Sequence, residues 1–181
     1  MIYRNDKITV RSITEADQQL LVDWLSNPEV LQYYEGRDRP HDFEMVRERF
    51  YLEDDETRCI VEYEGRAIGY IQFYQLADDS RQEYGYTDAD GIIFGMDQFI
   101  GEPDYWNRGI GKQLVSSMRD YLVYQHQADK VVMDPQTWNA RALACYEQCG
   151  FVKKKLLKEH ELHEGQFRDC WLIEFSAEVV R

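Results

Sequence analysis

The chain has 181 residues, of which 44% are hydrophobic and 14% aromatic, and its 34 acidic and 21 basic side chains give a net charge of −13. This length suits one compact core, so we expect a single domain over residues 1–181. The acidic excess argues against nucleic acid and anionic membranes as partners, because both require a basic footprint. It favours a cationic ligand through long-range attraction, although solubility alone is an alternative explanation of the charge.

Targeting and metal signals are weak. No apolar run approaches the ~20 residues that span a bilayer, and residues 1–17 hold no apolar signal region. We therefore expect a cytoplasmic protein with reduced cysteines. Cys145 and Cys149 are four residues apart without a CxxC unit, so no metal site is expected.

The N-terminal half is predicted to begin with one strand, continue with short helices and end with two strands. Alternation of apolar and polar residues predicts a strand over 8–13. Thr14 and Asp17 have the spacing of a capping box, and a helix with an apolar face follows. Residues 26–34 and 43–50 predict two more helices. Residues 58–76 then predict two strands joined by a tight turn at Glu64-Gly65.

The C-terminal half alternates strands and helices. After a polar loop, residues 91–100 predict a strand, 110–125 an amphipathic helix and 130–135 a short buried strand. Asn139 is a helix cap, with Leu143 and Tyr146 on the inner face and Gly150 at the C-terminal end. Two final strands surround a turn at Gly165. This order predicts an α/β domain around a mixed sheet.

The stretch "NRGIGKQLV" places two glycines between a strand and the helix at 110–125. Helix N-termini present unpaired N–H groups and a partial positive charge, which suit a phosphate. Gly109 and Gly111 remove side chains from the backbone, and Arg108 and Lys112 add positive charge. An ordinary tight turn is the alternative, since the full dinucleotide and Walker spacings are missing.

The order of elements, with "NRGIGKQLV" and "NARALACYEQCGF" on successive helices, resembles the GNAT superfamily of acyl-CoA-dependent N-acyltransferases. The resemblance covers nearly the whole chain. It implies the GNAT fold, a mixed and mostly antiparallel sheet with a splayed fourth and fifth strand pair and flanking helices. It also implies that acetyl-CoA is the co-substrate and that the glycine-turn amides hold its pyrophosphate.

A narrower resemblance is carried by "GMDQFIGEPDYW", "DPQTWNARALACYEQCGF" and "EHELHEG". These segments are similar to aminoglycoside 6′-N-acetyltransferases, especially the acetyltransferase half of a bifunctional enzyme. Because the resemblance is to that half, acetyl transfer is the only activity that we expect. One position departs from the superfamily: Trp106 stands where Gln or Arg usually begins the turn. An indole cannot serve that polar role, and we expect Arg108 to compensate.

The resemblance implies a coenzyme site along the strand at 91–100, the glycine turn and the following helices. Its expected residues are Phe99, Ile100, Asn107, Arg108, Gly109, Ile110, Gly111, Lys112 and Asn139.

Asp97 occupies the place of the superfamily's proposed base. An aspartate in an apolar strand is costly unless paired or solvated, although a structural hydrogen bond would also explain it. An ionised aspartate is a weak base, with an ordinary pKa of about 3.9, which favours orienting the ammonium or relaying its proton through water. Gln98, a second candidate for substrate binding, faces the other way unless a bulge intervenes. The superfamily often has such a bulge here, which would also free an N–H for the thioester carbonyl.

Three further residues are candidates. Tyr146 is by resemblance the general acid, with a core tyrosine as the alternative. Asp134 ends a strand where open α/β sheets place ligand residues; by resemblance it binds a substrate amine, and its alternative role is to cap the turn before Pro135. Tyr74 is expected either to line the sugar site or to belong to the core. His160 and His163 would face opposite sides of a strand, so a surface or hinge role is expected.

We therefore expect an enzyme that acetylates a primary amine of an aminoglycoside and confers resistance, by direct transfer in a ternary complex, because no cysteine suits a ping-pong nucleophile. It would act as a monomer or homodimer. The alternatives are acetylation of a polyamine or a protein N-terminus, and a non-catalytic acyl-CoA-binding sensor.

Overall fold

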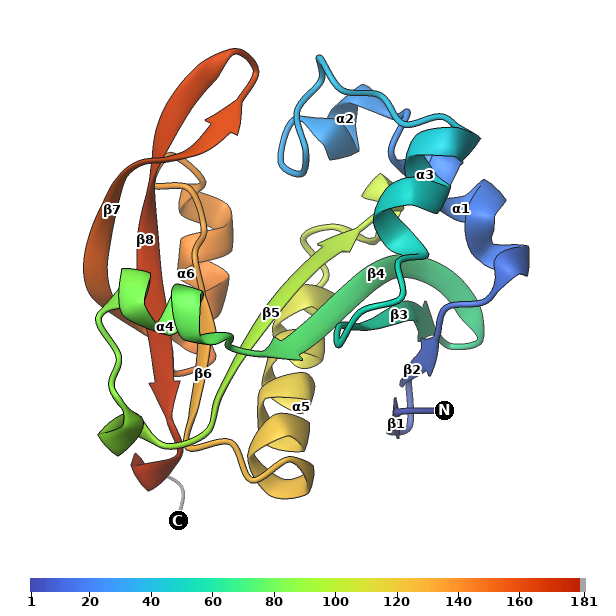
Figure 1. The fold of residues 1–181 in the computed structure, drawn as a ribbon. Coiled ribbons are helices and arrows are strands. Elements are labelled where there is room, and N and C mark those ends of the chain that lie inside the picture. The colour runs from blue at the N-terminus through green and yellow to red at the C-terminus, as the bar shows by residue number, and fades with distance from the viewer. Residues whose placement is uncertain (180–181) are drawn as a thin grey trace. The chain divides into compact units, whose positions relative to one another are not determined.

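The computed structural model describes residues 1–179 and joins eight strands in the order β1-β2-β3-β4-β5-β6-β8-β7 (Figure 1). β5 and β6 pair in parallel, whereas β1/β2, β2/β3 and β6/β8 are antiparallel, so the sheet is mixed as predicted. The strands are β1 (Tyr3–Arg4), β2 (Ile8–Ser12), β3 (Thr57–Tyr63), β4 (Arg66–Gln75), β5 (Ile93–Ile100), β6 (Lys130–Met133), β7 (Val152–His163) and β8 (Gln166–Ser176).

The helices follow the predicted order with one addition. Residues 76–90, predicted as a polar loop, contain α4 and the 3-10 turn η2. Gly85, with φ +85°, ends α4 in the left-handed conformation that favours glycine. The helices are α1 (Gln18–Trp24), α2 (Pro28–Leu31), α3 (Phe43–Phe50), α4 (Asp78–Tyr84), α5 (Ile110–Gln125) and α6 (Ala140–Gln148), and the 3-10 turns are η1 (Glu15–Asp17), η2 (Asp88–Asp90), η3 (Pro103–Tyr105) and η4 (Ala177–Val179).

Two tight turns join neighbouring strands. Glu64 and Gly65 have φ values of +50° and +85°, and Glu164 and Gly165 have +51° and +76°. Two successive positive φ angles define the turn type whose twist matches that of a hairpin. Both turns lie where the sequence predicted them.

The pairing of β5 with β6 covers only the first half of β5. Its register runs from Ile93 opposite Lys130 to Gly95 opposite Val132. β5 continues to Ile100, whereas the last residue of β6, Met133, pairs with Ile173 of β8. The splayed strand pair expected of the GNAT fold is thus β5 and β6, and Asp97 follows the end of their register.

The described residues form two compact units, and β4 and β5 each contribute to both. Unit 1 contains Met1–Gln72, Gln98–Arg108 and His163–Gln166. Unit 2 contains Phe73–Asp97, Gly109–Leu162 and Phe167–Arg181, of which the last two residues lie outside the described part. The expectation of a single domain stays a prediction.

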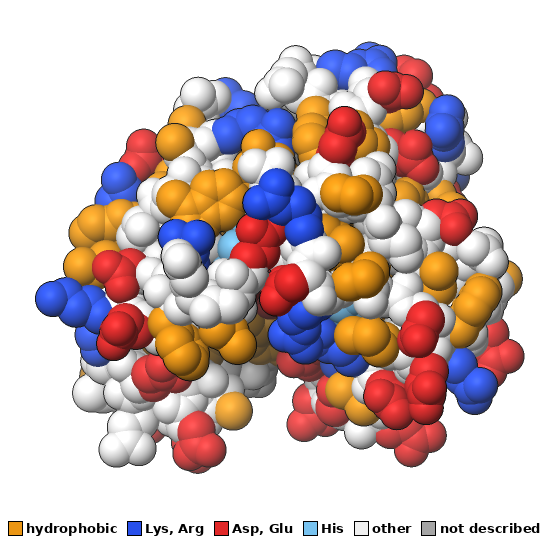
Figure 2. All heavy atoms as spheres, turned by 90° about the horizontal axis from the view of Figure 1, so that it is seen from above, with side chains coloured by type: hydrophobic (Ala, Val, Ile, Leu, Met, Phe, Trp, Pro, Cys, Tyr) orange, Lys and Arg blue, Asp and Glu red, His pale blue; other side chains and the backbone are white. Residues whose placement is uncertain are grey.

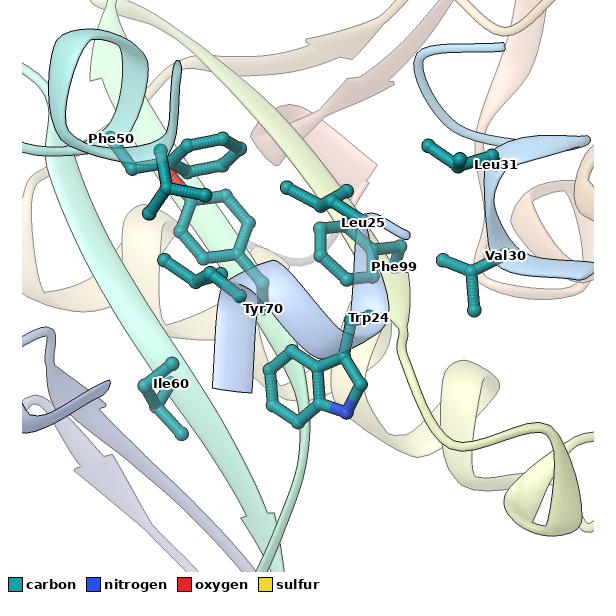
Figure 3. Packing of buried hydrophobic residues seen from close by; sticks show 10 residues of the cluster. Trp24, Leu25, Val30, Leu31, Phe50, Ile60, Tyr70 and Phe99 are labelled. Carbon is teal, nitrogen blue, oxygen red and sulfur yellow. The ribbon is translucent and has the colours of Figure 1, made fainter. Parts of the chain in front are cut away.

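The core of unit 1 is aromatic. Tyr70 is fully buried, and its ring lies 5.1 Å from that of Phe50 and 5.6 Å from that of Phe99, measured between centroids (Figure 3). Trp24 meets Phe99 edge to face at 6.1 Å. Such ring pairs add to the free energy gained by burying their area. They hold the end of β5, from Gln98 onward, within this unit.

Unit 2 is built around α5 and the strands that follow it. Ile110, Leu114, Met118 and Leu122 recur every four residues on α5 and are buried, which is the apolar stripe predicted from the sequence. A separate buried cluster includes Ile93, and three tyrosines pack against it, namely Tyr74, Tyr84 and Tyr86.

Within residues 1–179, none of the helices has the length and hydrophobicity needed to cross a membrane. All four cysteines are free thiols.

Candidate active site

Asp97 of β5 is held by a tyrosine of the neighbouring strand. The hydroxyl of Tyr74 donates to Oδ2 of Asp97 over 3.3 Å. Gly95 makes this contact possible, because a Cβ atom there would lie 2.6 Å from the Tyr74 ring. Both side chains are half-buried in unit 2. The structure thus brings together two residues that the sequence proposed separately.

Asp134, directly after β6, lies in a second set of polar contacts within the same unit. Its Oδ2 accepts a hydrogen bond of 3.0 Å from the hydroxyl of Tyr84 and contacts Nε2 of His160 at 2.8 Å. The Nδ1 atom of His160 lies 3.2 Å from Oε1 of Glu83. The Asp134 carboxylate is therefore held by side chains from α4 and β7.

The surroundings of Tyr84 disfavour loss of its hydroxyl proton. Burial raises the pKa of its hydroxyl, and the negative charges of Asp134, Glu83 and Asp97 raise it further. Tyr84 therefore stays protonated as the hydrogen-bond donor to Asp134. The sequence missed this residue because α4 was predicted as a loop.

The surface role expected for His160 and His163 is wrong, whereas the hinge role stays a prediction. The side chain of His160 is only 18% exposed, and His163 is buried. The physical reason is an irregularity in β7: Glu159 has φ +49°, and its N–H donates to the side chain of Asp169 over 2.8 Å. A residue in this conformation breaks the alternation of a strand and re-aims the next side chain.

The glycine turn before α5 has the local geometry of an anion cradle. Asn107 and Gly109 have φ values of +56° and +75°. A Cβ atom built on Gly109 or Gly111 would meet nothing within 4 Å. The first N–H groups of α5 have no partner within the helix, and its first turn holds no acidic residue. The backbone here is open to a phosphate group, which fits a pyrophosphate.

The expected coenzyme residues of unit 1 differ in what they could offer a ligand. Phe99 is buried in the core, so only its backbone could serve, and Ile100 accepts a hydrogen bond of 2.9 Å from the Trp106 indole. Trp106 is thus a structural support of the turn. Arg108 is exposed, and its guanidinium lies 4.9 Å above the ring of Tyr105. Gln98 also belongs to this unit.

The α6 candidates lie in unit 2. Asn139 caps the helix through a hydrogen bond of 3.2 Å from the N–H of Ala142, which confirms its predicted cap. Tyr146 has a half-buried side chain, and Leu143 is buried on the inner face. Lys112 of α5 is exposed, and Ile110 is buried, so only the backbone of Ile110 could contact a ligand.

Within the described residues, no three His, Cys, Asp or Glu side chains form a group that could hold a metal ion.

A family model confirms the superfamily expected from the motifs. Residues 14–158 match the model described as "Acetyltransferase (GNAT) domain". An aminoglycoside N(6′)-acetyltransferase type 1 from Klebsiella pneumoniae is 28% identical over 154 residues, which cover 83% of this chain and 76% of the relative. A spermidine N(1)-acetyltransferase from Vibrio cholerae is 21% identical over 91% of this chain and 90% of its own.

Solved structures show the same fold. The aminoglycoside acetyltransferase AAC(6′)-Ib in complex with coenzyme A and kanamycin matches with a TM-score of 0.76 at 24% identity, covering 94% of this chain and 95% of that one. The spermidine N-acetyltransferase from Vibrio cholerae in complex with coenzyme A and spermine matches with a TM-score of 0.75 at 18% identity, covering 96% and 98%. At these identities the likeness extends to the fold alone.

Proposed function

This chain belongs to the GNAT acetyltransferase family and is an N-acetyltransferase, and we propose that it transfers the acetyl group of acetyl-CoA to a primary amine of an aminoglycoside. The observation that carries the acceptor class is the presence of two half-buried carboxylates, Asp97 and Asp134, in one unit, each held by a tyrosine hydroxyl. Such carboxylates suit an acceptor with several ammonium groups.

The coenzyme would bind at the glycine turn, where it supplies the activated acetyl group. The N–H groups at the start of α5 would hold its pyrophosphate, since Gly109 and Gly111 leave the backbone open. Arg108 and Lys112, both exposed, would add positive charge to this site in an acidic protein.

Asp97 would orient the reacting ammonium and accept its proton, directly or through water, because only the neutral amine is a nucleophile. The hydrogen bond from Tyr74 fixes the carboxylate for this role. Tyr146 would donate a proton to the departing thiolate. Asp134 would bind a second ammonium group of the acceptor. The transfer would be direct, without a covalent enzyme intermediate.

A polyamine is the second candidate acceptor. The spermidine N(1)-acetyltransferase of Vibrio cholerae matches nearly the whole chain, and the same two carboxylates would suit its acceptor. Acidic side chains also lie at several places on the face shown in Figure 2, with basic and hydrophobic ones between them. Charge alone therefore does not distinguish an aminoglycoside acceptor from a polyamine acceptor.

A thiol-release assay with acetyl-CoA tests the proposal. The acceptors would be kanamycin, spermidine and a peptide with a free N-terminus, each at the same concentration. We expect kanamycin to give the highest kcat/KM. A higher kcat/KM with spermidine or the peptide would contradict the proposal and make that compound the acceptor. Binding of the coenzyme without thiol release in the presence of any of the three would support the alternative of a non-catalytic acyl-CoA-binding sensor.

A further inference from the structure

His160 lies between two carboxylates, an arrangement that favours a charged imidazole. One ring nitrogen lies 2.8 Å from Asp134 and the other 3.2 Å from Glu83. A neutral imidazole has one N–H and one lone pair, so it would turn that lone pair towards a carboxylate oxygen. The imidazolium has an N–H at both nitrogens, donates to Asp134 and carries its charge within 3.2 Å of Glu83. The geometry therefore favours a positive charge beside Asp134.

Most of the polar groups around His160 are acidic. The hydrogen bond to Asp134 raises the pKa of His160, burial lowers it, and the charges of Asp134, Glu83 and Glu161 raise it further, so that the net shift is upward. The polar groups around the ring are Glu83 and Tyr84 of α4, Asp134 after β6, Glu161 of β7 and, through the Glu159 backbone, Asp169 of β8. One basic group is also near, since Nζ of Lys155 donates to the Glu83 carbonyl.

The backbone of β7 is bent where it delivers this side chain. Glu159 is a non-glycine residue at φ +49°, a conformation that costs free energy. Asp169 stabilises it by accepting the Glu159 N–H. This irregularity turns the His160 side chain toward Asp134. In a regular strand, the alternation of side chains would point it outward.

We propose that His160 is a positioning residue of the acceptor site: its imidazolium holds the Asp134 carboxylate, and it gives up its proton when an acceptor ammonium pairs with Asp134. The inference rests on the proposed function of Asp134 as an amine-binding residue. Two cations at one carboxylate repel each other, so the bound ammonium lowers the proton affinity of His160. By reciprocity, the proton on His160 weakens amine binding to the same extent.

This linkage makes acceptor binding pH-dependent in a defined direction. Acceptor affinity rises as the pH rises through the pKa of His160, up to the pH at which the acceptor amine loses its own proton. The His160→Gln variant keeps a donor to Asp134 without a charge. Its acceptor affinity should depend little on pH in the same range.

The direct test follows the pKa of His160 by nuclear magnetic resonance in the coenzyme A complex, with and without saturating kanamycin or spermidine. The ring of His126 contacts Phe73, Phe94 and Tyr121 and serves as the internal reference. We expect the proton affinity of His160 to fall about fivefold or more with a bound amine, within the usual range of site-to-site coupling. In free protein, Asp134→Asn should lower the pKa of His160.

A second measurement follows acceptor binding itself. Calorimetry in two buffers of different ionisation enthalpy, near the pKa of His160, should detect proton release when the amine binds. That release should be missing in His160→Gln. A purely structural role for His160 would leave the proton count unchanged.

The outcomes separate the inference from the proposed function. Acetylation of an amine whose binding leaves the pKa of His160 unchanged would overturn the inference alone. A shifted pKa without acetylation of any amine would support the inference and contradict the proposed reaction. Neither shift nor acetylation would overturn both.

Discussion

The hydroxyl of Tyr74 and the carboxylate of Asp97 form a hydrogen bond of 3.3 Å between neighbouring strands, and Gly95 leaves the space that the tyrosine ring occupies. The bond fixes the orientation of the carboxylate. In the role proposed for Asp97, a carboxylate that is already fixed loses less conformational entropy when the acceptor binds.

Asp97→Asn tests this role directly. The variant is nearly isosteric, so it removes charge and proton acceptance while keeping shape. We expect kcat/KM to fall at least about tenfold, which corresponds to about 1.4 kcal/mol of transition-state stabilisation. Tyr74→Phe is the matched variant, since it removes only the hydroxyl, and it should cause a smaller loss. Steady-state kinetics with saturating acetyl-CoA would measure both, and wild-type kcat/KM in Asp97→Asn would contradict the role.

Gly111→Val tests the coenzyme turn. A Cβ atom at Gly111 meets nothing within 4 Å, so the variant should fold, but its side chain would crowd a pyrophosphate at the start of α5. We expect coenzyme affinity, measured by calorimetry, to fall at least about tenfold. Gly111→Ala is the control, with a smaller effect on binding and a slightly more stable helix. Unchanged affinity in a folded valine variant would remove the turn from the coenzyme site.

Tyr146→Phe tests general acid catalysis. The variant keeps the ring and removes only the proton donor, so the melting temperature should change little. Proton donation of this kind normally contributes ~10²–10⁴-fold, and we expect kcat to fall by at least the lower of these factors. Turnover within about twofold of wild type would mean that the departing thiolate takes its proton elsewhere.

Local patterns predicted most of the fold. The four-residue spacing of apolar side chains gave α5 its observed bounds, and the Glu-Gly pairs marked both hairpin turns. Both signals depend on residues close together in the chain. α4 was missed because none of its residues is buried, so its sequence carries no apolar stripe.

The sequence proposed several residues of the candidate site but not the contacts between them. Asp97, Tyr74 and Asp134 were proposed one by one, but the pairing of Tyr74 with Asp97 depends on strand register, which the sequence does not encode locally. His160 was assigned to the surface or a hinge because a regular strand was assumed. The positive φ of Glu159 invalidates that assumption, and no local sequence signal indicated it.

The acidic composition leads to a prediction on ionic strength. With a net charge of −13, the protein attracts a polycationic acceptor from a distance. Salt screens this attraction, with a Debye length of ~10 Å at 0.1 M. We expect kcat/KM for the acceptor to fall as salt rises, with acetyl-CoA saturating because the coenzyme is itself an anion. Indifference to salt would weaken the case for a polycationic acceptor.

The ion pair of Arg11 with Asp17 allows a prediction on stability. Asp17 is 4% exposed and accepts two hydrogen bonds from the Arg11 guanidinium, of 2.9 and 2.8 Å. Arg11→Met leaves this carboxylate buried without its cation, and we expect it to lower the free energy of unfolding at pH 7 by about 3 kcal/mol. Lys7→Met is the control, because the Lys7–Glu64 pair is exposed at 55% and 61%, and it should cost less than about 1 kcal/mol.

The same pair predicts how stability depends on pH. Burial alone would raise the pKa of Asp17, but the hydrogen bonds from Arg11 and Thr14 outweigh it and hold the pKa below its usual value. A carboxyl group whose pKa is lower in the folded state binds protons more readily when unfolded. Its stabilising contribution is therefore complete above the unfolded pKa of about 3.9 and is lost as the pH falls through the folded value. Urea unfolding at pH 7, 5 and 3 should show Asp17→Asn less stable than wild type at the two higher pH values, with the difference shrinking at pH 3. A difference that is equal at all three would mean that the charge of Asp17 contributes nothing to stability.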